Sequence, residues 1–493
     1  MKKTALLLAL LTAAGVCISS CGESAPSGTP GGENPDAGDT AAVETEPAET
    51  RTPHAVPVDT LDFGGDEFRM LAVDWGPFHY YYKADETNGD IMNDALYARK
   101  LAVEEALNVK IRADYCDGYI AEIVQAIQKF VSAGEDAYDQ VFVHCIQGVA
   151  QLASGGYLYD LDALPYVDTD AEWWNRKQMD ALKLGKCSYY AVNDSMIPCP
   201  YVLYFNKDMV RELDLEDPYT LVYEKKWTLD VFSEMVTEVT ADLNGDGVLD
   251  DADRYGIAAN DDSCYISFVP AAGQFITGRD ADGKIVPAVN TPKMQVLMET
   301  FADLAEKKAI HVQQNGAGSE GHLTMNSNQL LFFASDLTNA ESMREYTVDF
   351  GFLPYPMFDE AQEDYISLEW GGLTAVPTTI SRPEIVGSVM ELMAYTSADD
   401  VLPTYYDTVL QGKLARDENS VKMIDLLFDT VAYEIGGNYF GFDSGFNALF
   451  YALPNVAIKT KQSNFASLYK SNEKATEAVI KKFYKSLELN EAD

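Results

Sequence analysis

Residues 242–253 read D-L-N-G-D-G-V-L-D-D-A-D, and their spacing matches a twelve-residue calcium-binding loop of the EF-hand type. Oxygen atoms at positions one, three and five of such a loop converge on the ion, and the glycine at position six permits a sharp turn. The predicted ligands are Asp242, Asn244, Asp246, the carbonyl of Val248, Asp250 and Asp253. Asp253 departs from the pattern, because glutamate usually occupies position twelve. We expect a structural Ca²⁺ site, and the alternative is a solvated acidic turn.

Other groups of reactive residues are too scattered to predict an enzyme. Gly316, Gly318 and Gly321 fit a dinucleotide-binding pattern, but no clear strand precedes them and no helix follows. The histidines are far apart and lack the H-E-x-x-H spacing of zinc enzymes. Glu369 could supply one carboxylate of a glycosidase pair, although the sequence does not place the second. We therefore expect no catalytic residues, and a secreted glycoside hydrolase is the alternative function.

Aromatic side chains give a stronger indication of a ligand. The flat faces of sugar rings stack on aromatic rings, while neighbouring polar side chains bond the hydroxyl groups. Trp75 follows the first expected strand and Trp370 precedes a pair of glycines, both at places that we expect to face a cleft. The predicted ligand-binding residues are Asp74, Trp75, Asp194, Tyr201, Glu369 and Trp370. Trp227, directly before the expected N-cap Thr228, is instead predicted to be a packing residue.

The elements that must position these residues alternate between strand and helix. With 493 residues, the chain is long enough for two or three domains. The main expected elements are strands at residues 68–73, 108–111, 138–144, 201–205 and 329–334, and helices at 91–107, 119–132 and 291–307. A hairpin is expected at residues 280–283, and residues 383–493 read as mostly helical. This order predicts an α/β fold.

Residues 184–207 read L-G-K-C-S-Y-Y-A-V-N-D-S-M-I-P-C-P-Y-V-L-Y-F-N-K. This wording resembles the extracellular solute-binding proteins of bacterial ABC importers, family 1, carbohydrate type. W-W-N at residues 173–175 and F-G-F-L-P-Y-P at residues 350–356 add to the resemblance. It covers about residues 60–450, with loose individual motifs in a specific order.

The resemblance implies a two-lobe periplasmic-binding-protein-like fold of type II. Lobe 1 would comprise residues 59–203 with 371–493, and lobe 2 residues 204–370 with the calcium loop. Hinge crossings would lie near residues 201–205 and 366–372. A sugar or oligosaccharide would bind between the lobes and be delivered to a membrane permease. A surface glycan-binding module without a transporter is a further alternative.

Residues 1–20 have the features of a secretory signal peptide. Two lysines precede a short apolar run, and small residues follow it. The I-S-S-C sequence that ends at Cys21 resembles the lipobox of bacterial lipoproteins, which implies that Cys21 is lipidated. Residues 21–58 have almost no large apolar side chains, so a flexible linker is expected there. We therefore expect an extracytoplasmic protein that is anchored to the membrane as a lipoprotein.

Composition excludes some partners. The formal net charge is −42, so we expect no binding to nucleic acid, which needs a basic surface. Apart from Cys17 and Cys21, five cysteines occur at irregular spacing, which indicates no disulfide framework. A single pair, such as Cys187 with Cys199, stays open. We expect a monomer.

Overall fold

The computed structural model describes residues 52–73, 84–117, 120–146, 148–260, 262–312, 323, 325–369, 371–407, 410, 416–441, 445–450 and 453–490. By its internal contacts the chain divides into two compact units, Met1–Pro53 and His54–Asp493. Every helix and strand given below belongs to the second unit. The predicted signal peptide, Cys21 and nearly all of the predicted linker lie outside the described residues.

The first sheet has the strand order β12-β3-β1-β2. Its strands are β1 (Asp66–Val73), β2 (Val109–Cys116), β3 (Gln140–His144) and β12 (Gly372–Ala375). β1 pairs in parallel with β2 and β3, whereas β12 pairs antiparallel with β3. Every residue of β3 is buried, as expected for a central strand of a sheet that is covered on both faces.

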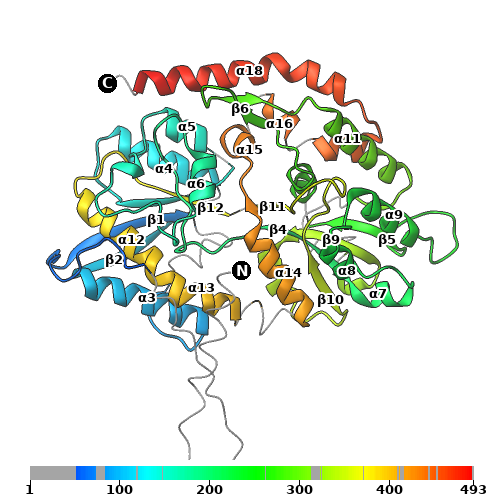
Figure 1. The fold of residues 1–493 in the computed structure, drawn as a ribbon, viewed down its shortest axis with the longest axis horizontal. Coiled ribbons are helices and arrows are strands. Elements are labelled where there is room, and N and C mark those ends of the chain that lie inside the picture. Colours follow the sequence, from blue (N-terminus) through cyan, green and yellow to red (C-terminus); the bar gives the residue numbers. More distant parts are fainter. Residues whose placement is uncertain are drawn as a thin grey trace, which may run out of the picture. The chain divides into compact units, whose positions relative to one another are not determined.

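Helices from distant parts of the chain cover this sheet (Figure 1). They are α3 (Ile91–Leu107), α4 (Ile120–Ser132), α12 (Pro383–Asp399) and α13 (Val401–Thr404). The carboxylate of Asp90 caps the start of α3 by accepting the N–H of Asn93, and Asn108 ends the helix with a left-handed φ of 49°. The first sheet and these helices are called lobe 1 below.

The second sheet has the strand order β10-β4-β9-β5-β8. Its strands are β4 (Tyr201–Asn206), β5 (Tyr255–Ala259), β8 (Ile310–His311), β9 (Leu330–Asp336) and β10 (Phe350–Leu353). β5 pairs in parallel with β8 and β9, while β4 runs antiparallel to both β9 and β10. The apolar run of β4 is buried along its whole length, which explains its aromatic sequence.

Five helices accompany the second sheet, and with it they form lobe 2. They are α7 (Lys207–Glu212), α8 (Pro218–Tyr223), α9 (Leu229–Val239), α10 (Phe268–Ala271) and α11 (Pro292–Glu306). Trp227 is fully buried before α9, packs on Phe332 of β9 and donates its indole N–H to the carbonyl of Pro354 at 2.9 Å. The prediction of a packing residue at this position is confirmed, as is the N-cap at Thr228.

The remaining elements are short or lie late in the chain. They are α5 (Val149–Ser154), η2 (Leu161–Ala163), α6 (Arg176–Leu182), η3 (Asp262–Ser267), β6 (Thr277–Arg279), β7 (Ile285–Pro287), η4 (Met325–Ser327), η5 (Leu337–Glu341), β11 (Ser367–Leu368), α14 (Glu418–Asp429), β13 (Val431–Ala432), α15 (Ile435–Phe440), α16 (Phe446–Leu449), α17 (Leu453–Thr460) and α18 (Phe465–Asn490). β6 and β7 form the expected hairpin around residues 280–283.

The C-terminal part of the chain contacts both lobes, although the sequence assigned residues 371–493 to lobe 1. α14 packs on β10 of lobe 2, where the hydroxyl groups of Tyr219 and Ser420 lie 2.8 Å apart. Just before α14, Asp417 forms an ion pair of 2.6 Å with Lys207. α18 contacts α5 and also α11, so it touches elements from both halves of the chain. The elements from α14 to α18 therefore contact both halves of the folded unit.

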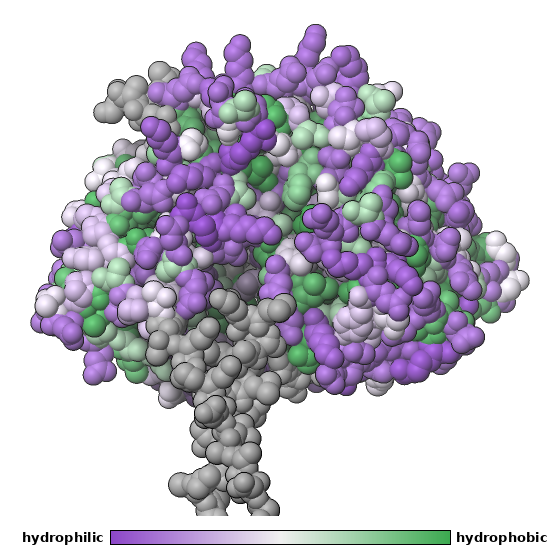
Figure 2. All heavy atoms as spheres, viewed as in Figure 1, coloured by the Kyte–Doolittle hydropathy of each residue, from purple (hydrophilic) through white to green (hydrophobic). Residues whose placement is uncertain are grey.

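Hydrophilic residues predominate on the face drawn in Figure 2, with hydrophobic residues in small groups between them. Among the described residues, no helix has both the length and the apolar character needed to cross a bilayer.

Candidate functional site

Three segments that connect the two lobes lie side by side within the described residues. The first crossing ends at Pro200, just before β4, and pairs with Glu369 of the second crossing, which contains β11 and leads into β12. The third crossing, residues 430–434, contains β13, which pairs in parallel with β11. The second crossing therefore lies between the other two. The sequence predicted two crossings, and the third was missed.

Glu369 joins all three crossings. Its side chain is buried, with 3% of its surface exposed. One carboxylate oxygen, Oε1, accepts the N–H of Cys199 at 2.9 Å and the N–H of Gly371 at 2.7 Å. The backbone N–H of Glu369 donates to the carbonyl of Ala432 in the third crossing at 2.9 Å. These bonds give Glu369 a positioning role, and its contact with a ligand stays a prediction.

Asp194 and Tyr201 both adjoin the crossings. Asp194 is half-buried, and its N–H donates to the carbonyl of Trp173 at 2.9 Å. Tyr201 is buried at the start of β4, opposite Asp336 of β9. The other predicted ligand-binding residues, Asp74, Trp75 and Trp370, lie outside the described residues. In sequence they directly follow β1 and the buried Glu369.

Two polar residues at the edge of the second sheet were missed. Asp336 ends β9 and Asn260 directly follows β5, the parallel neighbour of β9. Both are half-buried. Thr338 donates its N–H to Oδ1 of Asp336 at 3.0 Å, and the Cys199 thiol contacts the same atom at 3.7 Å.

A sequence signal for Asp336 existed. Ligands of α/β sheets bind beyond the carboxyl ends of the parallel strands. The rule that points to Asp74, an acid at the carboxyl end of an expected strand, points equally to Asp336, which lies two residues beyond the expected strand at 329–334.

Burial keeps one histidine and two thiols beside the crossings uncharged. His144 ends β3, and its complete burial lowers its pKa to about 3, so the imidazole is uncharged at neutral pH. Burial raises the pKa of the Cys145 and Cys199 thiols well above their ordinary value. These thiols are therefore not activated nucleophiles. None of the five cysteines in the described part of the folded unit is in a disulfide, so Cys187 and Cys199 are not paired.

The paired tryptophans before the first crossing belong to the core of lobe 1. Trp173 and Trp174 are both almost completely buried. Their indole N–H groups donate to the two carboxylate oxygens of Glu391 on α12, at 2.9 and 2.7 Å. Burial raises the pKa of Glu391. These tryptophans anchor residues 173–175 to α12 and do not line a ligand site.

The predicted calcium loop, residues 242–253, is folded around its own acidic side chains. The Asp242 carboxylate accepts the N–H groups of Gly245 and Gly247, each at 2.7 Å. Gly247, at position six, has a φ of 83°, which a residue with a side chain rarely adopts. Asp253 is fully buried and accepts the N–H of Leu243 at 2.8 Å and of Asp250 at 2.9 Å.

These backbone bonds lower the pKa of Asp253 and keep it ionised at neutral pH. In the part of the chain that the structure describes, no three acidic, histidine or cysteine side chains are gathered as a metal-binding group. The calcium site stays a prediction.

No protein-family model and no curated protein matches the sequence. Solved structures match over most of the chain. The galacto-N-biose-/lacto-N-biose I-binding protein of an ABC transporter from Bifidobacterium longum, solved with lacto-N-biose, has a TM-score of 0.60 at 12% identity and covers 85% of this chain and 98% of its own.

Two further structures show the same likeness. An ABC substrate-binding protein from Listeria monocytogenes in complex with cycloalternan has a TM-score of 0.56 at 14% identity, over 84% of this chain and 99% of its own. The maltose-maltodextrin binding protein of Alicyclobacillus acidocaldarius has a TM-score of 0.54 at 13% identity, over 84% of this chain and 100% of its own. The predicted α/β, two-lobe periplasmic-binding-protein-like fold is confirmed.

Proposed function

We propose that this protein is the lipid-anchored substrate-binding component of an ABC importer, which captures a sugar or oligosaccharide between its two lobes and delivers it to a membrane permease. The observation that carries the proposal is the set of three crossings between two α/β lobes, with half-buried polar residues beside them. Crossings of this kind act as a hinge, so the lobes can close over a ligand.

The chemistry at the crossings favours binding over catalysis. The histidine and the two thiols beside them are held neutral by burial, and Glu369 is occupied by backbone N–H groups. Asp336 and Asn260 offer polar atoms that suit hydroxyl groups, as predicted for Asp74 and Asp194 on the other side. Trp75 and Trp370 would supply the apolar contact with sugar rings. The solved structures of similar fold are named as binding proteins for saccharides, which supports a saccharide ligand here.

A thermal-shift screen against mono- and oligosaccharides tests the proposal. A ligand that binds only the folded state stabilises it by about 2.7 kcal/mol when its free concentration is 100 times Kd. We expect at least one saccharide to raise the melting temperature without being altered, as judged by chromatography of the recovered sugar. A saccharide that is cleaved would instead support a glycoside hydrolase. A panel with no stabilising saccharide would contradict the proposed ligand class.

Two further experiments test the anchor and the transporter. Replacing Cys21 with serine should release the protein from the membrane fraction, because serine cannot carry the thioether-linked lipid. A Cys21→Ser variant that fractionates with membranes as firmly as the parent would contradict lipidation. The ligand-loaded protein should stimulate ATP hydrolysis by its permease, and a surface glycan-binding module would stimulate none.

A further inference from the structure

The third crossing has two hydrogen-bonding edges, and among the described residues only one of them faces a strand. On one edge, Ser367 and Glu369 of the second crossing donate their N–H groups to the carbonyls of Thr430 and Ala432, both at 2.9 Å. Alternate residues of a strand direct their backbone groups to opposite edges. The carbonyl of Val431 and the N–H of Tyr433 therefore belong to the other edge.

The side chain of Gln178 occupies that other edge. Gln178 lies on α6 of the first half of the chain and is buried, with 3% of its surface exposed. Its Nε2 donates to the carbonyl of Val431, and its Oε1 accepts the N–H of Tyr433 at 3.2 Å. A primary amide carries a donor and an acceptor side by side, as a peptide group does. Gln178 thus takes the place of a neighbouring strand.

Glu434, which follows Tyr433 in the third crossing, is held by a different part of the chain. The carboxylate of Glu434 is buried and accepts the N–H groups of Ile276 at 3.1 Å and Thr277 at 3.4 Å, where the chain of lobe 2 enters β6. The third crossing is therefore fastened by one side chain to α6, in the segment before the first crossing, and by its own carboxylate to the segment before β6. When one lobe rotates against the other, the backbone conformation must change between these two attachments.

We infer that Gln178 is a positioning residue of the hinge: by holding the third crossing against α6, its amide sets the balance between open and closed arrangements of the lobes. Its effect on affinity rests on the proposed function, because a protein whose binding-competent arrangement is less populated binds its ligand more weakly by that fraction. Its effect on the third crossing itself does not depend on any ligand.

Two substitutions separate the hydrogen bonds from packing. Gln178→Met keeps a side chain of similar length and removes both bonds. Gln178→Glu keeps the acceptor for Tyr433, but an ionised carboxylate cannot donate to Val431, whereas a protonated carboxyl group can. Because burial raises the pKa of a glutamate, lowering the pH should restore the donor in this variant alone. Gln362→Met is the matched control: the Gln362 amide also bridges backbone groups, donating to Ala271 and accepting from Phe358, but within lobe 2.

The experiment measures amide hydrogen exchange of residues 430–434 in the empty protein, together with the affinity for a saccharide found by the thermal-shift screen. For Gln178→Met we expect faster exchange at these residues and at least fivefold weaker binding, because each net hydrogen bond corresponds to roughly that factor. Gln178→Glu should behave like Gln178→Met at pH 8 and return toward the parent at pH 5.5. The parent contains the same neighbouring ionisable groups as the variant, including Glu434. Its exchange rate at each pH is therefore the baseline. Gln362→Met should leave both readouts as in the parent.

Unchanged exchange at residues 430–434 in Gln178→Met would overturn the inference. Faster exchange that is matched by Gln362→Met would overturn it too, because both would then reflect general destabilisation. So would a Gln178→Glu variant whose exchange has the pH dependence of the parent. Since the exchange measurement needs no ligand, failure of the proposed saccharide function would leave this test intact.

Discussion

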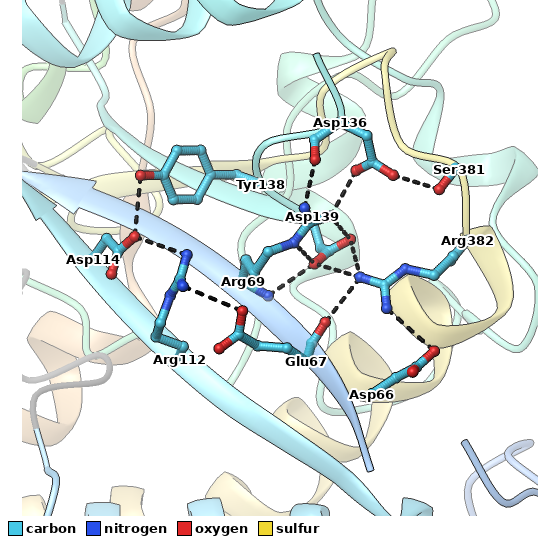
Figure 3. Close-up of polar contacts among 10 residues, drawn as sticks. All are labelled: Asp66, Glu67, Arg69, Arg112, Asp114, Asp136, Tyr138, Asp139, Ser381 and Arg382. Carbon is cyan, nitrogen blue, oxygen red and sulfur yellow. Dashed lines mark hydrogen bonds and ion pairs between the residues drawn. The ribbon is translucent and has the colours of Figure 1, made fainter. Parts of the chain in front are cut away.

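Two regions of the molecule, one edge of lobe 1 and the crossings, are held together by different kinds of interaction. At the edge where β1 and β3 begin, ion pairs between charged side chains hold the elements together (Figure 3). The fully buried carboxylate of Asp139 accepts from Nε of Arg69 at 2.9 Å and from Nη2 of Arg382 at 3.2 Å. At the other end of the same strands, the crossings are joined by backbone hydrogen bonds and by the uncharged amide of Gln178. Glu369 there bonds N–H groups of the backbone.

The charged edge links three parts of the chain that are distant in sequence. Asp136 accepts from Arg69 at 2.6 Å and from the hydroxyl of Ser381, while Arg382 also reaches Asp66 at 3.4 Å (Figure 3). Asp139 raises the pKa of Arg69 further above its ordinary value. Removing one partner from a buried ion pair is costly, so this edge resists distortion. Backbone bonds between short strands can instead adjust to a small rotation. We therefore expect the charged edge of lobe 1 to be rigid and the crossings to allow a small rotation.

The largest expected effect comes from breaking the charged edge. Asp139→Ala leaves two guanidinium groups without their shared carboxylate, and we expect a loss of about 3–5 kcal/mol in the free energy of unfolding. Denaturant unfolding measures it. Glu67→Ala, which removes a half-exposed partner of Arg112 in the same cluster, should cost at most about 1 kcal/mol. Equal losses in the two variants would contradict the rigid-edge interpretation.

Aromatic residues beside the crossings should affect binding more than folding. Trp75→Ala and Trp370→Ala should each weaken ligand binding by about 2–4 kcal/mol, as expected for a buried aromatic contact. Trp227→Ala should lower the melting temperature without a selective loss of affinity, because Trp227 is buried within lobe 2. Titration of each variant with the identified ligand, together with a thermal melt, distinguishes the cases. If the first two variants bind like the parent, the ligand does not lie between these residues.

Stability should depend on pH through Glu434 at the third crossing. Burial raises its pKa from 4.5 to about 7, so the folded state holds the proton more tightly than the unfolded state. The resulting stabilisation is fully present below pH 4.5 and is lost as the pH rises through about 7. We expect the parent to lose about 3 kcal/mol over this range relative to Glu434→Gln. Unfolding curves at several pH values measure the difference, and parallel pH profiles would refute it.

The smallest effect is expected at residues 242–253 of lobe 2, far in sequence from both regions. If calcium binds the loop, chelation should lower the melting temperature, by the equivalent of about 1.4 kcal/mol for free calcium at ten times Kd. Asp246→Ala should remove this sensitivity, because Asp246 supplies one of the predicted ligands. A melting curve of the parent that is indifferent to chelator would leave an acidic turn closed by its own backbone bonds.

Much of the fold could be predicted because local signals agreed with it. The helix expected at residues 91–107 has those bounds in the structure, and the helix expected at 291–307 is α11. Both begin after a side-chain cap, Asp90 or Thr291, which marks the end of a helix in sequence. The buried strand expected at residues 201–205 is β4.

The third crossing could not be predicted in this way. β13 is two residues long, and its strand conformation depends on pairing with β11 rather than on its own pattern. Gln178 and Val431 are 253 positions apart, and Glu434 and Ile276 are 158 apart, so no local signal connects them. No local signal connects the Asp139–Arg382 ion pair either, because its members are 243 positions apart. Of the candidate site, Asp336 could have been found, because it ends an apolar strand.

The placement of β12 has a consequence for biosynthesis. β12 pairs with β3 at one border of the first sheet, yet it is encoded after every strand of the second sheet. A chain that is made from its N-terminus must therefore carry β3 with one unpaired edge until residues 372–375 emerge. An unpaired edge of a largely apolar strand is a template for association with other chains. The nascent protein is thus most prone to aggregate while lobe 2 is being synthesised, and the arrival of four late residues ends that period.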